Sequence, residues 1–389
     1  MIFLVLFLPA TIIWGLGSFS FYRESGENFY LVASVSFFLF YLFLVLSSLR
    51  FFKVQAVSAR LDLISPFKLL LFVKIIVFFL VVVATIQIFL TIHYSGQFGY
   101  DYARFYVRSL PFFGFLSRIE YWWAIALSPI LAYLIYFGLS KLNIFILVMS
   151  LMYVELASGS KAGVVWFFLS FLLSFIYFKN INYAYYKRFK KMLIFMAFFS
   201  FFLLFSAFWI YSGAEILPAI NGLIYRLSFG AIEGLLYVKD YFEIHGYSFP
   251  AFSLVRPIEL SFSTFRLIEK DYLNSVDTGV FLARYFEREN DLASWTISWV
   301  GLGYLDLGWF GVFLIGFFLI FFIFNLLNNV YRSNKLLIKF FSISLLVVVA
   351  HFLDWGWSDG IFVFALIYVI LFYLLLFIFL AFIPWKKSR

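Results

Sequence analysis

Charged residues are scarce in this sequence, and cysteine is absent. Asp, Glu, Lys and Arg together make up 13% of the 389 residues, and there are only three histidines. Soluble domains carry about a quarter charged residues, so a soluble fold is excluded. Without cysteine, and with no H-x-x-x-H or D-x-D spacing, the histidines provide no credible metal site. We therefore expect a metal-independent protein with no cofactor.

Apolar residues replace the missing charge. The chain is 65% hydrophobic and 25% aromatic. A helical membrane crossing needs about 20 apolar residues, because backbone polar groups in hydrocarbon must be satisfied within the segment. Many such runs are present, and the alternating pattern of barrel strands is not. The sequence predicts an all-α, polytopic membrane protein.

About ten membrane spans are expected along the chain. The first run lacks a basic n-region and an A-x-A cleavage site, which favours a retained span over a signal peptide. We expect residues 1–389 to form a single integral membrane domain. The expected spans are 2–16, 29–49, 69–92, 121–138, 142–157, 162–178, 192–211, 307–327, 338–353 and 360–383.

The basic residues of the short loops predict the orientation, because Lys and Arg near span ends stay on the cytoplasmic side. They gather in every second loop, which predicts that both termini are cytoplasmic. One large loop, residues 212–303, then lies outside between the seventh and eighth spans. Loops of this length are usually functional. We expect it to contain helices that fold against the membrane.

The two sides differ in their kind of cation. On this topology the outer side has nine Arg and three Lys, and the inner side five Arg and twelve Lys. The inner lysines follow the positive-inside rule, whereas the outer arginines oppose it. Guanidinium forks bind phosphate and carboxylate bidentately, which favours an anionic, phosphate-bearing ligand on the outer side. The alternative is pairing with acids, which also lie mostly outside.

A short turn between two apolar runs places one cation at the outer surface. The sequence ELASGSKAGVVWFF, residues 155–168, contains Lys161 among small residues. One interpretation is a contact of Lys161 with a diphosphate, with Glu155 as its partner. The other is a turn residue that snorkels to the headgroups.

The first part of the large loop predicts an amphipathic helix within residues 222–246. Arg226, Glu233 and Asp240 are seven residues apart and therefore share one face. In the functional interpretation Arg226 faces a cavity and Glu233 pairs with it or positions it. In the alternative, the helix lies in the interface with solvated charges. His245 near its end is a candidate general base, or simply a hydrogen-bonded interfacial residue.

The second part of the large loop adds further arginines. Arg256 precedes Pro257, which disfavours the α conformation at Arg256 and holds it extended. Such an arginine can point at a ligand, and Arg266 and Arg284 are further candidate contacts. Against this, Arg284 lies close to Glu287, which is also compatible with ordinary surface pairing.

These features resemble the Wzy-type O-antigen and exopolysaccharide repeat-unit polymerases, which are related to the O-antigen ligases. The resemblance rests on the many spans, the SGSKAG turn, the large outer loop, and WVGLGYLDLGWFGV at residues 299–312. The family's turn usually reads G-S-R-G or S-R-x-G. Here Lys161 stands where Arg is typical, and an alanine precedes the final glycine.

The resemblance implies a GT-C-like membrane glycosyltransferase in a bacterial inner, or plasma, membrane. It would polymerise oligosaccharide repeat units, carried on undecaprenyl diphosphate, into O-antigen, capsule or exopolysaccharide at the outer face. Partners would be this substrate, the lipid bilayer, a chain-length regulator and a flippase, with no nucleic acid. Lys161, Arg226 and Arg256 would stabilise the diphosphate. Glu233, His245 or Asp306 would act as the base, with Arg266, Arg284 and Asp306 among the substrate contacts.

Two other classes remain open. A flippase or transporter of lipid-linked oligosaccharides would also have many spans and charged cavity residues, although the sequence contains no internal repeat. A non-catalytic assembly protein of polysaccharide export would share the same composition. The sequence does not predict the repeat unit, its linkage, the stereochemical outcome or the oligomeric state.

Overall fold

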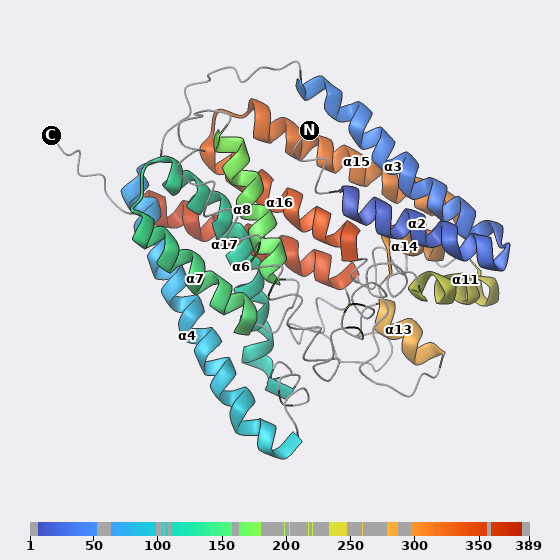
Figure 1. The fold of residues 1–389 in the computed structure, drawn as a ribbon, viewed down its shortest axis with the longest axis horizontal. Helices are drawn as coiled ribbons and strands as arrows, with labels where there is room; N and C mark the ends of the chain where they lie inside the picture. Colours follow the sequence, from blue (N-terminus) through green and yellow to red (C-terminus); the bar gives the residue numbers. More distant parts are fainter. Residues whose placement is uncertain are drawn as a thin grey trace. The chain divides into compact units, whose positions relative to one another are not determined.

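The protein is helical throughout the part of the chain that the structure describes. The computed structural model describes residues 7–52, 64–98, 110–157, 163–179, 233–246, 278–286, 297–355 and 359–382, with a few isolated positions between them. The helices are α2 (Leu8–Ser25), α3 (Asn28–Phe52), α4 (Pro66–Phe98), α6 (Pro111–Tyr136), α7 (Lys141–Ala157), α8 (Gly163–Lys179), α11 (Glu233–His245), α13 (Thr278–Tyr285), α14 (Trp299–Leu307), α15 (Trp309–Arg332), α16 (Leu336–Trp355) and α17 (Asp359–Phe382) (Figure 1).

Six of these helices are long and apolar enough to cross a membrane. They coincide with expected spans and lie within α3, α4, α6, α15, α16 and α17. The expected spans at 142–157 and 162–178 are present as the shorter apolar helices α7 and α8. The expected span at 192–211 lies outside the described residues, apart from isolated positions. A helical membrane protein is thereby confirmed, whereas the number ten stays a prediction.

The chain groups into two compact units, which we describe one at a time. The first comprises residues 1–55, 208–331 and 348–366, and the second comprises residues 56–207, 332–347 and 367–389. The expectation of one membrane domain stays a prediction.

In the first unit, α2 and α3 form a helical hairpin. Gly26 ends α2 with a φ of 71°, a left-handed conformation that glycine adopts without strain, and its N–H donates to the carbonyl of Tyr22. Ser34 on α3 donates a hydrogen bond of 2.7 Å to the carbonyl of Gly15 on α2. Trp14 is fully buried and stacks on Phe37 at a ring separation of 5.8 Å. The two helices are therefore held by close packing as well as by their short turn.

The helices α14 and α15 form a second close pair in this unit. Ser298 begins α14, because its side chain accepts a hydrogen bond of 3.3 Å from the N–H of Gly301. Gly308, with a φ of 61°, separates the two helices. A side chain at Gly303 would lie 2.6 Å from the backbone nitrogen of Val312, so the two backbones touch where glycine is required. These glycines belong to the WVGLGYLDLGWFGV sequence.

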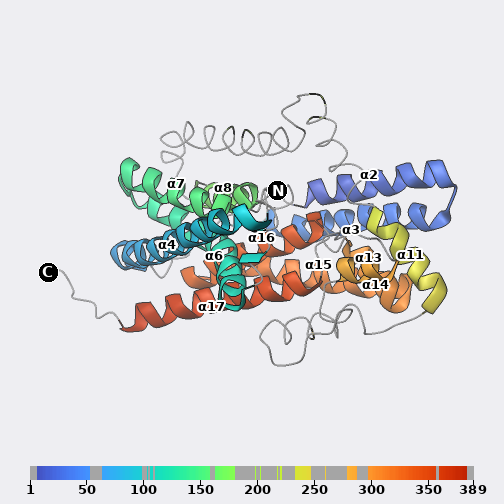
Figure 2. The same ribbon diagram turned by 90° about the horizontal axis from the view of Figure 1, so that it is seen from below.

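In the second unit, α6 is the central helix. In the most apolar stretch of α6, 94% of the residues are buried, whereas in that of α4 44% are buried. The neighbouring helices α4, α7 and α8 all contact it, and α4 also runs along α7 (Figures 1 and 2). Ser128 on α6 donates a hydrogen bond of 2.6 Å to Ser170 on α8. The centre of this unit therefore accommodates polar groups inside a helix bundle.

Candidate functional site

Of the helix expected within residues 222–246, the structure describes α11, Glu233–His245, and residues 222–232 lie outside the described residues. Leu235 and Val238 are fully buried, and both reach the position of Gly301 on α14, where a Cβ atom would come within 3.2 Å of either. On the same helix, Phe242 packs on Tyr304 at 4.5 Å between ring centroids. The apolar face of α11 is therefore fixed against α14, and its polar face is presented away from that contact.

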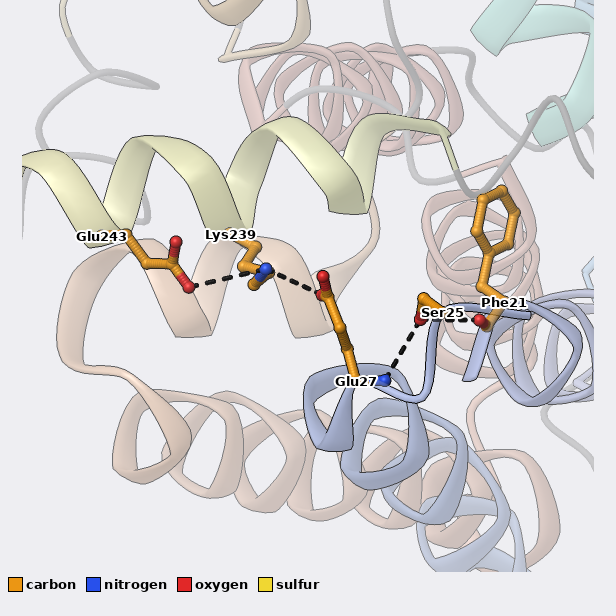
Figure 3. A network of polar contacts seen from close by, with 5 residues as sticks. All are labelled: Phe21, Ser25, Glu27, Lys239 and Glu243. Atoms are coloured by element: carbon orange, nitrogen blue, oxygen red, sulfur yellow. Dashed lines mark hydrogen bonds and ion pairs between the residues drawn. The ribbon is translucent and has the colours of Figure 1, made fainter. Parts of the chain in front are cut away.

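One cation on the polar face of α11 is engaged by acids (Figure 3). The ammonium of Lys239 lies 2.7 Å from Glu27, at the turn between α2 and α3, and 3.6 Å from Glu243. The Glu27 N–H donates to the Ser25 hydroxyl at 3.2 Å, and that hydroxyl donates to the carbonyl of Phe21. The hydrogen bond with Glu27 is the main cause that raises the pKa of Lys239. Lys239 is therefore engaged by acids from two helical segments and is not available to an anion.

His245 lies at the end of α11 among aromatic rings. Its Nε2 is 2.7 Å from the hydroxyl of Tyr285 on α13; His245 is exposed and Tyr285 is half-buried. The ring of Tyr241 lies 4.4 Å from the imidazole and 5.0 Å from Tyr285. We call Tyr241, His245, Phe281 and Tyr285 the α11–α13 aromatic cluster. The structure thus assigns the imidazole a specific hydrogen bond.

The remaining predicted site residues of the first unit are only partly described. Glu233 is the first residue of α11 and Arg284 lies on α13, and both side chains lie outside the description. Asp306 is buried in α14, with 2% of its surface exposed. The structure therefore brings the helices of Glu233, His245 and Arg284 together, while Asp306 lies inside the packing of α14.

The predicted phosphate contacts lie outside the described residues. This holds for Lys161, Arg226, Arg256 and Arg266. Their assignment as diphosphate ligands therefore stays a prediction.

The second unit contains ionisable side chains that were not predicted as a site. Glu120 on α6 and Glu155 on α7 are fully buried, and they are close enough to interact electrostatically. Arg118 precedes Glu120 by two residues and therefore points from a different face of α6; it is half-buried and lies beside the hydroxyl of Tyr368 on α17. We call Arg118, Glu120 and Glu155 the buried charged cluster, in which the two acids interact with each other and Arg118 interacts with Tyr368. Two acids and a guanidinium thus lie inside the bundle formed by the apolar helices of this unit.

Tyr368 is fixed beside this cluster by its own neighbours. Its ring lies 5.6 Å from Phe115 of α6, and its backbone carbonyl accepts a hydrogen bond of 3.1 Å from the indole of Trp123. Trp123 and Phe115 both belong to α6, so α17 is held along the stretch of α6 that contains Arg118 and Glu120. The guanidinium therefore lies in a fixed environment.

A longer α6 explains why the cluster was missed. The expected span began at residue 121, whereas α6 begins at Pro111, so Arg118 and Glu120 are part of a helix and not of a loop. Two ionisable residues lower the local hydrophobicity, and the apparent span boundary moves past them. Proline is common at the first turn of a helix, so the proline at 111 was the available signal. Glu155 was recognised only as a partner for Lys161.

The residues that the structure describes contain no group of three or more His, Asp or Glu side chains able to hold a metal ion. Comparison with protein-family models, with curated proteins and with solved structures finds no match to this chain.

Proposed function

We propose that this protein polymerises lipid-linked oligosaccharide repeat units at the outer face of the plasma membrane. The observation that supports this most directly is the buried charged cluster of Arg118, Glu120 and Glu155. Ionisable residues in membrane-spanning segments are costly, and where they occur they usually serve a charged substrate or a proton. Buried ionisable residues inside this helix bundle therefore indicate function more than stability.

The cluster lies at the end of the bundle where the reaction is expected. The helices α6 and α7 are in contact and joined by the short turn 137–140, so they run in opposite directions. Glu120 lies in the first half of α6, and Glu155 lies in the last turn of α7. The SGSKAG sequence with Lys161 begins three residues after Glu155. On the predicted topology this end faces outward, where the phosphate-bearing substrate is exposed.

These residue types suit glycosyl transfer from a lipid diphosphate. The acceptor hydroxyl attacks the anomeric carbon of the donor chain, and the bond from that carbon to the diphosphate oxygen breaks. The electron pair leaves with undecaprenyl diphosphate, whose charge Arg118 and Lys161 would stabilise. The hydroxyl proton passes to a carboxylate, for which Glu120 and Glu155 are the candidates in this unit.

The same cluster favours one second candidate, a proton-coupled transporter of lipid-linked oligosaccharides. Buried carboxylates in membrane helices are also typical of proton relays in transporters. The two candidates differ in where the intermediates accumulate, because a flippase acts before the repeat unit reaches the outer leaflet and a polymerase acts after.

A deletion strain tests the proposal, with the gene restored as wild type, Arg118→Ala, Glu120→Gln or Glu155→Gln. We expect each variant to insert at normal level and to lose at least about 100-fold of polymer formation, the range of a missing general base or charge partner. Single repeat units should accumulate on the outer leaflet. The matched control is Glu24→Gln, an exposed acid on α2. Accumulation inside would favour the transporter, and full-length polymer from all three variants would remove the cluster from the mechanism.

A further inference from the structure

The α11–α13 aromatic cluster has an arrangement that packing alone does not require. The ring of Tyr241 is surrounded by three others, at 4.4 Å from His245, 5.0 Å from Tyr285 and 5.6 Å from Phe281. Phe281 is buried, whereas Tyr241 and Tyr285 are half-buried and His245 is exposed. The cluster thus has an apolar base and an outer layer of rings that reach the surface.

The polar atoms of the outer layer are arranged at the surface as well. The His245 Nε2 and the Tyr285 hydroxyl, 2.7 Å apart, form a hydrogen-bonded pair that is exposed. A phenol hydroxyl both donates and accepts, and imidazole has a second ring nitrogen. A ligand at this surface therefore meets a ring face and hydrogen-bonding edges side by side.

The charges described on α11 favour one class of ligand. Asp240 and Glu243 lie on the same helix, and the one described cation of α11, Lys239, is held by Glu27. Burial is the largest cause that raises the pKa of Asp240; Lys239 lowers that pKa, and Glu243 and Glu27 raise it further. Among the described side chains of α11, the one Lys is thus held by acids, which favours a neutral, hydroxyl-rich ligand over a phosphate.

We propose that the α11–α13 aromatic cluster is a carbohydrate-binding subsite that holds a sugar ring of the oligosaccharide through its C–H face. The faces of aromatic rings carry partial negative charge, so they attract the weakly positive C–H groups of a pyranose. The His245–Tyr285 pair supplies hydrogen bonds to the sugar hydroxyls. The identity of the sugar as part of a lipid-linked repeat unit rests on the proposed function.

Binding of a phosphate-free probe tests this subsite separately from polymerisation. The probe is the oligosaccharide repeat unit released from its lipid carrier by mild acid, added to the purified full-length protein in nanodiscs. Saturation-transfer NMR and calorimetry give the binding constant. We expect Tyr241→Leu to weaken binding at least tenfold and Tyr241→Phe, which keeps the ring, to change it less than threefold. Tyr285→Phe should weaken binding several-fold, because it removes only the hydroxyl.

Tyr22→Leu is the matched control, since Tyr22 is a half-buried tyrosine of α2 outside the cluster. The subsite would be overturned if Tyr241→Leu binds the probe as tightly as the wild type. It would also be overturned if the wild-type protein shows no saturable binding of the probe. If Tyr241→Leu disturbs folding, Tyr241→Phe should lose binding as well. In that case Tyr285→Phe decides, and normal binding by Tyr285→Phe would overturn the proposal. If the cluster binds the probe but the deletion strain makes normal polymer, the subsite stands and the polymerase proposal fails.

Discussion

At the scale of single residues, burial of Asp240 disfavours its charged form, a penalty that a neutral side chain would remove. Burial raises its pKa, as do Glu243 and Glu27, while Lys239 lowers it. A carboxyl whose pKa is raised on folding costs stability once the pH rises above that value, and the cost is absent below the unfolded pKa. We therefore expect Asp240→Asn to raise stability at pH 7, by less than about 1 kcal/mol for a partly exposed site.

This gain should shrink as the pH falls from 7 toward 4, because wild-type Asp240 becomes protonated and then resembles asparagine. Thermal unfolding of both proteins in detergent across this range measures the effect. Glu24→Gln, an exposed acid of α2 in the same unit, is the control and should show no comparable gain. A less stable Asp240→Asn at pH 7 would contradict the penalty that we assign to the charged form of Asp240.

At the scale of secondary-structure elements, the approach of α14 to α15 depends on two glycines. A Cβ at Gly303 would lie 2.6 Å from the nitrogen of Val312, and one at Gly311 would overlap the carbonyl oxygen of Gly303. Backbone atoms cannot yield as a flexible side chain can, so Gly303→Ala and Gly311→Ala should each destabilise by roughly 1–3 kcal/mol. The free energy of unfolding of each variant and of the wild type, measured in the same series of mild detergents, gives the loss of stability.

The control for these two substitutions is Gly96→Ala in α4. A Cβ there meets nothing within 4 Å. Alanine is favoured over glycine inside a helix by about 1 kcal/mol, so Gly96→Ala should be neutral or stabilising. Gly303→Ala as stable as the wild type would show that the two helices are not held in contact.

Hydrophobic runs predicted the elements well, and the ends of the elements less well. The expected span at 29–49 agrees closely with α3, and that at 360–383 with α17, because both are uninterrupted apolar runs. The start of α6 was misplaced because charged residues such as Arg118 and Glu120 are typical of loops. In the structure, residues of α7 and α17 lie beside them within the bundle. The sequence at residues 299–312 was singled out for a family resemblance. Its glycines Gly303 and Gly311 allow α14 and α15 to approach closely, which the sequence alone did not indicate.

The candidate site was less predictable than the fold for a physical reason. Helical periodicity placed Glu233 and His245 on one helix, which α11 confirms. Periodicity does not say which charges from distant segments meet, so the pairing of Lys239 with Glu27 and the approach of Glu120 to Glu155 were not foreseen. The predicted diphosphate contacts of Arg226 and Arg256 likewise depend on distant segments meeting, and they stay predictions.

At the scale of the whole molecule, the predicted topology places both termini in the cytoplasm. The chain has no cysteine, so single cysteines report on side without a background. The three positions chosen are exposed and lie at helix ends: Ser25, Ser140 and Asn334. A membrane-impermeant thiol reagent should label Ser25→Cys in intact cells. It should label Ser140→Cys and Asn334→Cys only after permeabilisation, and labelling of all three from outside would contradict the topology.

The central claim is that this chain alone elongates a lipid-linked glycan, and reconstitution tests it most directly. Purified protein in liposomes is given the lipid-diphosphate-linked repeat unit as the only substrate, and the products are separated by length. Our account predicts a ladder of products that increase by one repeat unit, with release of undecaprenyl diphosphate, and no ladder from Glu120→Gln. Substrate that stays a single repeat unit with the wild-type protein, or that only changes leaflet, would contradict it.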